Sequence, residues 1–239
     1  MIYVMSDIHG NMQYFNSVMK KIDLQPKDTL YILGDVIDRH PDGIKILRRI
    51  MAMPNAKMLL GNHEYMMLNS IDETGTIKNR LQYSLWSRNC GNITLKSFKH
   101  QRISVRKDIY DYLKSLPINI KIEVEGKKYL LAHAAPVEMF NEDWYEYDDE
   151  VEFAVWYRWH GAEIYPKEHT LVIGHTYTYR YNGINPLQIY HCKYADLIAI
   201  DCGSGFPPPE HRRDLRGRLS CLRLDDMKEF YSDEVIFDE

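Results

Sequence analysis

The chain has few cysteines and no long apolar run, which argues against a disulfide-rich protein and against a membrane-spanning one. Only four of its 239 residues are cysteine (Cys90, Cys192, Cys202 and Cys221), with neither the C-x-x-C spacing of a zinc site nor the density of a disulfide scaffold. Reduced thiols are therefore expected, which suits a cytoplasmic protein. No stretch approaches the roughly 20 apolar residues that span a bilayer, and the apolar start at 2–5 is too short for a signal peptide. The sequence thus predicts a cytoplasmic protein without membrane partners.

An excess of basic charge is also absent. The 30 Lys and Arg residues are outnumbered by 34 Asp and Glu residues, which gives a net charge of -4. Proteins that bind the phosphate backbone usually present a basic face, so nucleic acid is not an expected partner. An anionic substrate is still compatible with this composition, because bound metal cations can dominate the local field. The oligomeric state is left open.

The first third of the chain alternates short apolar strands with helical patterns, which predicts parallel βαβ units. Residues 74–116 form a polar segment that is expected to be a helical insertion or cap, and the later strands indicate a more antiparallel second half. The predicted fold class is α/β, a layered α/β/β/α sandwich with mixed sheets in a single domain over 1–239. Strands are predicted at 2–5, 29–33, 56–60, 118–124, 128–131, 171–173, 197–200 and 219–224, and early helices at 11–22, 43–53 and from 64.

Metal-binding residue types follow the first two predicted strands. The segment 6–10 contains Asp7 and His9, whose carboxylate and imidazole are good ligands for divalent metals. The segment 34–39 contains Asp35, Asp38 and Arg39. One carboxylate can bridge two cations, the other can orient a histidine, and the guanidinium can bind phosphate oxygens in a bidentate manner. Taken singly, a surface Asp, a hydrogen-bonded His or a capped turn would also explain these segments.

Three further motifs repeat the arrangement at later strand ends, where ligands bind in open α/β sheets. Asn62 and His63 follow the third strand, and Asn62 could instead cap a helix. His133 and His175 each follow an apolar strand directly. An isolated histidine in such a position is commonly a hydrogen-bonded core residue, but ligand-type residues at five strand ends are improbable by chance. The combination therefore predicts one metal site.

The motifs occur in the order of the calcineurin-like metallophosphoesterases, which the chain resembles from Asp7 to the segment 217–219. The Asp38-Arg39 pair and Glu64 resemble the phosphoprotein phosphatase branch, specifically its bacterial and phage-like Ser/Thr protein phosphatases. The resemblance implies two divalent metal ions, with Mn expected and Fe or Zn compatible with the ligands. Asp7, His9 and Asp35 match the ligands of the first ion, and Asp35 would bridge. The matching ligands of the second ion are Asn62, His133 and His175.

The resemblance also implies the catalytic groups. His63 matches the general acid, Asp38 its orienting partner and Arg39 the phosphate clamp. A second phosphate-binding arginine is expected, and Arg158 in a Trp-x-Arg segment is the candidate, although Arg180 is near in sequence. The chain departs from the family pattern at 40–41, where His-Pro follows Asp-Arg, and at 134–135, where two alanines replace two glycines. These departures affect loop shape and leave the ligands intact.

The expected activity is hydrolysis of phosphomonoesters by a metal-bridging hydroxide, as in a Ser/Thr protein phosphatase, on a phosphorylated protein or a small phosphoester. The alternative is hydrolysis of bis-nucleoside polyphosphates, performed by a neighbouring branch that lacks the Asp-Arg pair in this form. A more remote alternative is a non-catalytic regulatory or scaffold protein on the same fold. Two other segments leave a substrate role open: the acidic 141–153, expected to be a surface loop, and the Pro-rich 206–213.

Overall fold

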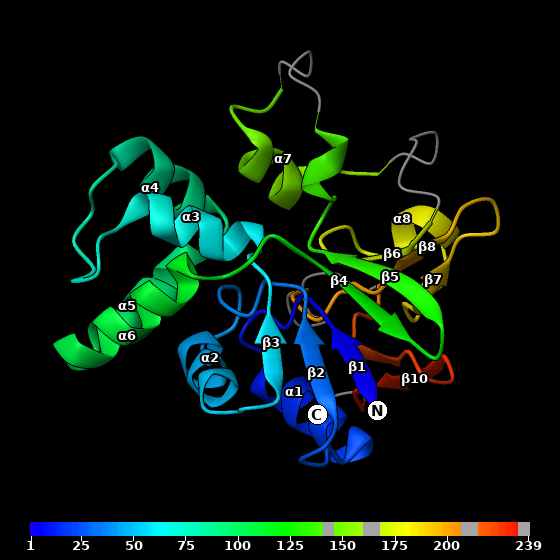
Figure 1. Ribbon diagram of the computed structural model, residues 1–239. Helices are drawn as coiled ribbons and strands as arrows, with labels where there is room; N and C mark the ends of the chain where they lie inside the picture. The colour runs from blue at the N-terminus through cyan, green and yellow to red at the C-terminus, as the bar shows by residue number, and fades with distance from the viewer. Residues whose placement is uncertain (141–145, 160–167, 207–214, 234–239) are drawn as a thin grey trace.

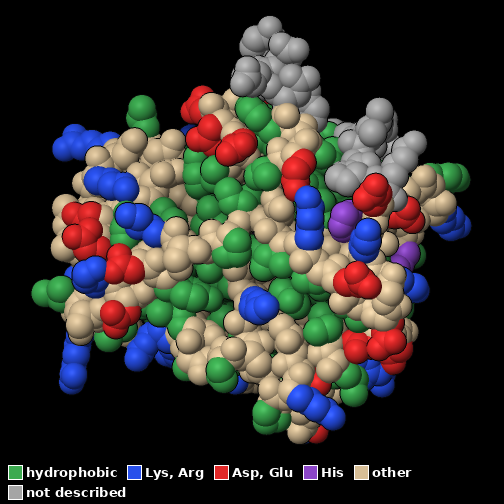
Figure 2. All heavy atoms as spheres, in the orientation of Figure 1, with side chains coloured by type: hydrophobic (Ala, Val, Ile, Leu, Met, Phe, Trp, Pro, Cys, Tyr) green, Lys and Arg blue, Asp and Glu red, His purple; other side chains and the backbone are tan. Residues whose placement is uncertain are grey.

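Two mixed five-stranded sheets stack face to face, and most of the helices lie on the first sheet or beside it (Figure 1). The structure is a computed structural model that describes residues 1–140, 146–159, 168–206 and 215–233. No helix in these ranges is long and apolar enough to cross a bilayer. The four cysteines form no disulfide. In the view of Figure 2, acidic and basic side chains are mixed over the helices rather than separated by sign.

The first sheet has the strand order β10-β9-β1-β2-β3. The three N-terminal strands pair in parallel, as the alternating sequence pattern predicts, and β9 pairs antiparallel with both β1 and β10. The strands are β1 (Ile2–Met5), β2 (Thr29–Ile32), β3 (Ala56–Met58), β9 (Ser220–Arg223) and β10 (Lys228–Tyr231).

The second sheet has the order β4-β5-β6-β8-β7. Its inner pairs β5-β6 and β6-β8 are parallel, whereas the β4-β5 hairpin and the β7-β8 pair are antiparallel. The expectation of a more antiparallel second half is confirmed, because β1, β2 and β3 pair with one another only in parallel, whereas β4-β5, β7-β8 and β9-β10 are antiparallel. Its strands are β4 (Asn119–Val124), β5 (Lys127–Ala132), β6 (Thr170–Ile173), β7 (Tyr190–His191) and β8 (Leu197–Ala199).

The helices fall into three groups. Helices α1 and α2 pack on the first sheet, and α3 to α6 follow β3, with α4, α5 and α6 inside the segment 74–116 (Figure 1). The remaining described helices, η1, α7 and α8, come after β5. Their bounds are α1 (Met12–Ile22), α2 (Gly43–Met51), α3 (Asn62–Ser70), α4 (Arg80–Arg88), α5 (Gly91–Lys99), α6 (Ile103–Lys114), the 3-10 helix η1 (Val137–Met139), α7 (Glu150–Trp156) and α8 (Tyr179–Asn182).

Alternation along the strands creates the layers. In β1, Val4 packs between the sheets while Tyr3 and Met5 face the helices. In β5, Leu131 packs between the sheets while Leu130 faces the opposite side. Successive side chains of a strand point to opposite faces, so each sheet contributes one face to the shared inner core. This confirms the predicted layered α/β fold, and in the described part of the chain the outer face of the second sheet is covered by the short α8 and by neighbouring side chains, several of them aromatic.

Three local expectations need correction. The acidic segment 141–153 is not a loop throughout: 141–145 lies outside the described residues, but α7 begins at Glu150. The Asp149 side chain caps that helix by accepting a bond from the Glu152 amide, and Phe153 is fully buried. Strands β7 and β10 were not predicted. Their two and four residues are too short to show a clear period, and pairing with β8 and β9 stabilises them.

The inner core predicts a stability difference between two leucines. Leu131 is completely buried between the sheets, so Leu131→Ala should lower the free energy of unfolding by about 2–5 kcal/mol through lost contacts and a cavity. Leu81 on α4 is 83% exposed, and Leu81→Ala should change it by less than about 0.5 kcal/mol. Urea unfolding followed by circular dichroism measures both. Equal losses would contradict the assignment of the core.

Candidate metal centre

The six predicted ligands converge from both sheets. Asp7 and Asp35 lie in the turns after β1 and β2, and Asn62 is the first residue of α3 after β3. His133 and His175 follow β5 and β6 in the second sheet. All six side chains are buried, with relative exposures of 1% for Asp7, 1% for His9, 1% for Asp35, 3% for Asn62, 0% for His133 and 7% for His175. A surface carboxylate or surface salt bridge is thus excluded for Asp7 and Asp35.

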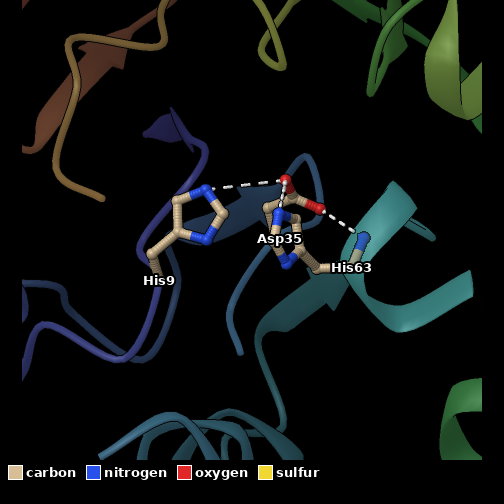
Figure 3. A group of neighbouring side chains, drawn as sticks. All are labelled: His9, Asp35 and His63. Carbon is tan, nitrogen blue, oxygen red and sulfur yellow. Dashed lines mark hydrogen bonds and ion pairs between the residues drawn. The ribbon is translucent and has the colours of Figure 1, made fainter. Parts of the chain in front are cut away.

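The first cluster that could hold a metal ion consists of His9, Asp35 and His63 (Figure 3). Nε2 of His9 lies 3.6 Å from Oδ2 of Asp35, and Nε2 of His63 lies 3.9 Å from the same oxygen. Oδ1 of Asp7 lies 3.8 Å from the same nitrogen of His9. The predicted ligands of the first ion therefore lie together, and His63 faces the same space.

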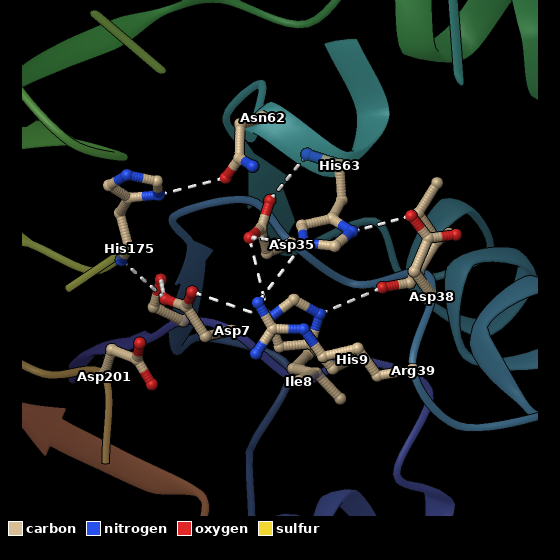
Figure 4. A network of polar contacts seen from close by, with 12 residues as sticks. Asp7, Ile8, His9, Asp35, Asp38, Arg39, Asn62, His63, His175 and Asp201 are labelled. Carbon is tan, nitrogen blue, oxygen red and sulfur yellow. Dashed lines mark hydrogen bonds and ion pairs between the residues drawn. The ribbon is translucent and has the colours of Figure 1, made fainter. Parts of the chain in front are cut away.

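The second cluster shares Asp35 with the first and adds His133 and His175. Nε2 of His133 lies 3.5 Å from Oδ1 of Asp35. The side-chain oxygen of Asn62 lies 3.0 Å from Nε2 of His133. It also lies 3.0 Å from Nδ1 of His175 (Figure 4). Asn62 does not cap α3, whose N-cap is Gly61, so its side chain is available to this cluster. One carboxylate thus has an oxygen toward each cluster.

Unusual backbone geometry positions these side chains. Asp7, His9, Asp35, Asp38 and His175 all have positive φ, between 51° and 68°. Non-glycine residues rarely adopt this left-handed region, and each such position costs on the order of 1–3 kcal/mol. Strain of this kind is stored at functional sites when the surrounding fold stabilises it. Here the turns after the strands are tight enough to direct alternate side chains into one space.

Glycines in the motifs allow close packing around the two carboxylates. A Cβ atom at Gly61 would lie 2.3 Å from Oδ1 of Asp35, and one at Gly174 would lie 2.3 Å from Oδ2 of Asp7. Both distances are far below contact, so any side chain would displace a carboxylate. Glycine is therefore required at both positions, because the neighbouring loops lie too close to leave room for a side chain.

Glu64 supports the Asp35 turn through the backbone. Its completely buried carboxyl group accepts bonds from the amides of Asp35 (2.8 Å), Val36 (2.9 Å) and Ile37 (3.3 Å). The sequence pattern marks Glu64 only as a family feature. Its contacts provide the physical reason, because the turn that carries Asp35 would otherwise leave three buried amides without acceptors.

His63 and Asp38 form a buried pair beside the clusters. Nδ1 of His63 lies 2.6 Å from Oδ2 of Asp38, and both side chains are at most 1% exposed. Burial alone would lower the pKa of His63, but the carboxylates of Asp35 and Asp38 raise it above its usual value. Arg39 is exposed, and its Nη2 lies 3.4 Å from Nε2 of His63. Trp86, which the sequence analysis missed, donates to the same Asp38 oxygen at 2.8 Å.

The imidazoles have the electrostatic character of metal ligands. Burial lowers the pKa of His9 well below its usual value, and Arg39 adds to the shift. Burial and the neighbouring His133 likewise lower the pKa of His175. Both rings are therefore neutral near pH 7, and neutral imidazole is the form that coordinates metals.

The buried carboxylates of Asp7 and Asp201 lie close to each other beside the clusters. Burial and the charge of Asp35 raise the pKa of Asp7, and burial and the charge of Asp7 raise that of Asp201 well above its usual value. Figure 4 shows Asp201 on the Asp7 side of the network. Several acidic groups held out of water favour a nearby cation. Neutral imidazoles beside crowded carboxylates fit divalent metal ions well.

The two candidate arginines occupy different positions. Arg158 donates from Nη1 to Oγ1 of Thr176 at 3.2 Å, directly beside His175. The Arg180 guanidinium instead lies 5.5 Å from the centre of the Tyr177 ring. Arg158 is therefore the arginine of the two that borders the clusters. The Pro-rich segment 206–213 lies, apart from Phe206, outside the described residues.

Sequence comparison decides the family. Residues 1–198 match the calcineurin-like phosphoesterase family. The chain belongs to this family. Its matched relatives include the symmetrical bis(5'-nucleosyl)-tetraphosphatase of Buchnera aphidicola, 32% identical over 148 residues that cover 54% of each chain. They also include serine/threonine-protein phosphatase 2 of Escherichia coli, 33% identical over 137 residues that cover 56% of this chain and 57% of that protein.

The chain thus spans about half the length of these curated relatives. Solved structures agree with the calcineurin-like phosphoesterase fold. A Saccharomyces cerevisiae protein serine/threonine phosphatase superposes with a TM-score of 0.59 at 16% identity, covering 100% of this chain and 80% of that one. A metallophosphoesterase from Sphaerobacter thermophilus gives 0.57 at 16% identity, with 99% and 89% covered. At such identities these likenesses concern the fold alone.

The Glu64 contacts predict a defect in metal binding. Glu64→Gln would place an amide donor against a backbone amide of the Asp35 turn, so Mn²⁺ affinity should fall by about tenfold. Glu73 is exposed, and Glu73→Gln should bind Mn²⁺ like the unaltered protein. Calorimetric titration of the metal-free proteins measures both. Unchanged affinity in Glu64→Gln would show that the turn does not depend on this side chain.

Proposed function

We propose that the protein is a metal-dependent phosphoester hydrolase that acts on phosphomonoesters in the manner of a Ser/Thr protein phosphatase. The observation that carries the proposal is the Asp35 carboxylate shared by two potential metal clusters, with the buried His63–Asp38 pair beside them. Membership of the calcineurin-like phosphoesterase family supports the hydrolase class.

The proposed ligands divide between two divalent ions. Asp7, His9 and Asp35 would hold the first, and Asp35 would join Asn62, His133 and His175 at the second. When bound, the ions would lower the pKa of a water molecule and neutralise charge on the phosphoryl group. The mixed carboxylate, amide and imidazole set suits Mn²⁺, with Fe or Zn²⁺ also compatible.

His63 would donate the proton that the leaving group needs. An alkoxide is a poor leaving group, so its departure requires protonation, and a positioned general acid contributes about 10²–10⁴-fold in rate. The ring has Nδ1 fixed on Asp38 and Nε2 directed toward the clusters, 3.9 Å from Asp35. In the proposed acid form, a proton on Nε2 would face the substrate side.

Two guanidinium groups would bind the phosphoryl oxygens. Arg39 is exposed yet within 3.4 Å of the His63 ring, and Arg158 lies beside His175 through Thr176. Arg39 thus lies near His63 of the first cluster, and Arg158 lies near His175 of the second. Guanidinium groups match the geometry of phosphate oxygens and can stabilise charge that spreads over them in the transition state.

The acid pair favours a monoester over a nucleotide polyphosphate. A nucleotide phosphate leaves as a stable anion and gains little from protonation, whereas a serine or threonine alkoxide depends on it. A carboxylate completely buried behind the histidine is consistent with the second case. A phosphorylated protein is therefore the proposed substrate, with small phosphomonoesters as simpler equivalents.

Hydrolysis of bis-nucleoside polyphosphates is the second candidate. A cavity of about 520 Å³ next to Arg158 is lined by Arg180, Tyr181 and Tyr190 among others. The two tyrosine rings stack with centres 5.2 Å apart. Aromatic and cationic groups beside a phosphate site could also receive a nucleoside, and the Buchnera aphidicola relative bears a tetraphosphatase name.

Replacing the proposed acid should separate chemistry from metal binding. His63→Asn removes the donor, so kcat on a phosphoserine peptide should fall by about 10²–10⁴-fold while the content of bound metal stays near normal. Steady-state kinetics and elemental analysis of the same preparation measure the two quantities. Activity that survives the substitution would overturn the assignment of His63.

Substrate preference separates the two candidate functions. The Mn²⁺-loaded protein should hydrolyse a phosphoserine peptide with a kcat/KM at least about tenfold above that for diadenosine tetraphosphate, since the acid assists only the peptide's leaving group. Removal of metal with a chelator should abolish both activities, and returning Mn²⁺ should restore them. The reverse preference would favour the nucleotide candidate, and metal-independent turnover would contradict the proposed centre.

A further inference from the structure

Trp86 connects the helical segment after β3 to the proposed acid. It belongs to α4, its side chain is completely buried, and its indole Nε1 donates to Oδ2 of Asp38 at 2.8 Å. The same oxygen receives Nδ1 of His63 at 2.6 Å. The Trp86 indole and the His63 ring are thus joined through one carboxylate oxygen.

We propose that Trp86 is a positioning residue that fixes Asp38, and through it the proton-donating orientation of His63. This inference rests on the proposed function of His63 and assigns a role to α4 and α5. Trp86 itself would contact neither substrate nor metal. Its effect should therefore appear only in reactions that need a proton on the leaving group.

The contacts of the carboxylate show why it needs a second donor. Asp38 is 0% exposed, and within the described part of the chain its Oδ1 has no hydrogen-bond partner. Its hold on the imidazole therefore depends on Oδ2 alone. Without the indole, rotation about the bond to the carboxylate would meet less resistance and could exchange the two oxygens. In metal sites, groups that fix the orientation of a histidine typically change affinity or activity by about 10–100-fold, and we expect the lower end of this range for a residue that acts through the carboxylate.

The position of the indole is itself determined by α5. A Cβ atom at Gly91, the first residue of α5, would lie 2.4–2.5 Å from ring atoms of Trp86, so the helix backbone packs directly against the indole. On the same helix, Oγ1 of Thr94 accepts the Asp38 amide at 2.9 Å. The backbone and the side chain of Asp38 are consequently both held by the segment that follows α3.

The test compares leaving groups within one variant. Trp86→Phe removes the indole N–H, so kcat on a phosphoserine peptide should fall by about tenfold with little change in KM. With p-nitrophenyl phosphate, whose leaving group needs no proton, kcat should stay within about twofold. A general loss of folding or metal would lower both rates together, so the ratio of the two rates reports on the acid.

Two further variants provide controls. Tyr83 lies one turn before Trp86 on α4, and its ring packs against the indole. Tyr83→Phe removes only the hydrogen bond that the Tyr83 hydroxyl donates to Asn92, so both rates should stay near normal. Benzothienylalanine at position 86 keeps the shape of the indole but replaces its N–H with sulfur. It should reproduce the selective loss of Trp86→Phe, and it decides the question if the phenylalanine variant fails to fold.

A double-variant cycle shows whether Trp86 acts through the acid. In a His63→Asn background, Trp86→Phe should cause no further loss on the phosphoserine peptide, because residues that act as a unit are not additive. The positioning role is wrong if the losses in kcat caused by the two substitutions multiply. It is also wrong if Trp86→Phe lowers kcat equally on the peptide and on p-nitrophenyl phosphate. Failure of the unaltered protein to hydrolyse either substrate with Mn²⁺ would instead contradict the proposed function.

Discussion

The Asp35 carboxylate lies between imidazoles contributed by two different sheets, and the arrangement of the rest of the molecule follows from keeping it there. One oxygen lies 3.6 Å from His9 of the first sheet and the other 3.5 Å from His133 of the second. The carboxylate keeps this position only if the two sheets stack in a fixed register. The inner core between the sheets fixes this register, since side chains from both sheets pack together in it.

Holding Asp35 in this position strains the backbone of the neighbouring turns. Its backbone has a positive φ, as do Asp7 and His9, and a glycine must stand at 61 to leave room for its oxygens. Three hydrogen bonds that backbone amides donate to the Glu64 carboxyl group offset part of this strain. The left-handed turns are therefore a consequence of bringing several ligand-type side chains to one point, and the buried hydrogen bonds make that geometry the stable one.

Much of this arrangement could be predicted from the sequence because it is local. Short apolar strands that alternate with helical patterns predict the parallel pairing, and a ligand-type residue directly after a strand predicts its position at the sheet edge. What was missed depends on tertiary contacts or on very short elements. Trp86 reaches Asp38 across 48 residues, and no local pattern distinguishes it from a core tryptophan. In contrast, α7 carries a readable capping signal at Asp149 and Glu152, which the acidic composition of that segment obscured.

The chemistry of the leaving group connects these observations to the choice between substrates. Metal ions can prepare the attack on any phosphoester, so the two clusters alone do not distinguish a phosphomonoester from a nucleotide polyphosphate. In the proposed function the His63–Asp38 pair would favour the monoester, because a proton donor assists a poor leaving group such as an alkoxide more than a nucleotide phosphate. Burying the Asp38 carboxylate carries a desolvation cost that the donors on its Oδ2 offset. This buried pair is therefore consistent with the alkoxide leaving group of the proposed substrate.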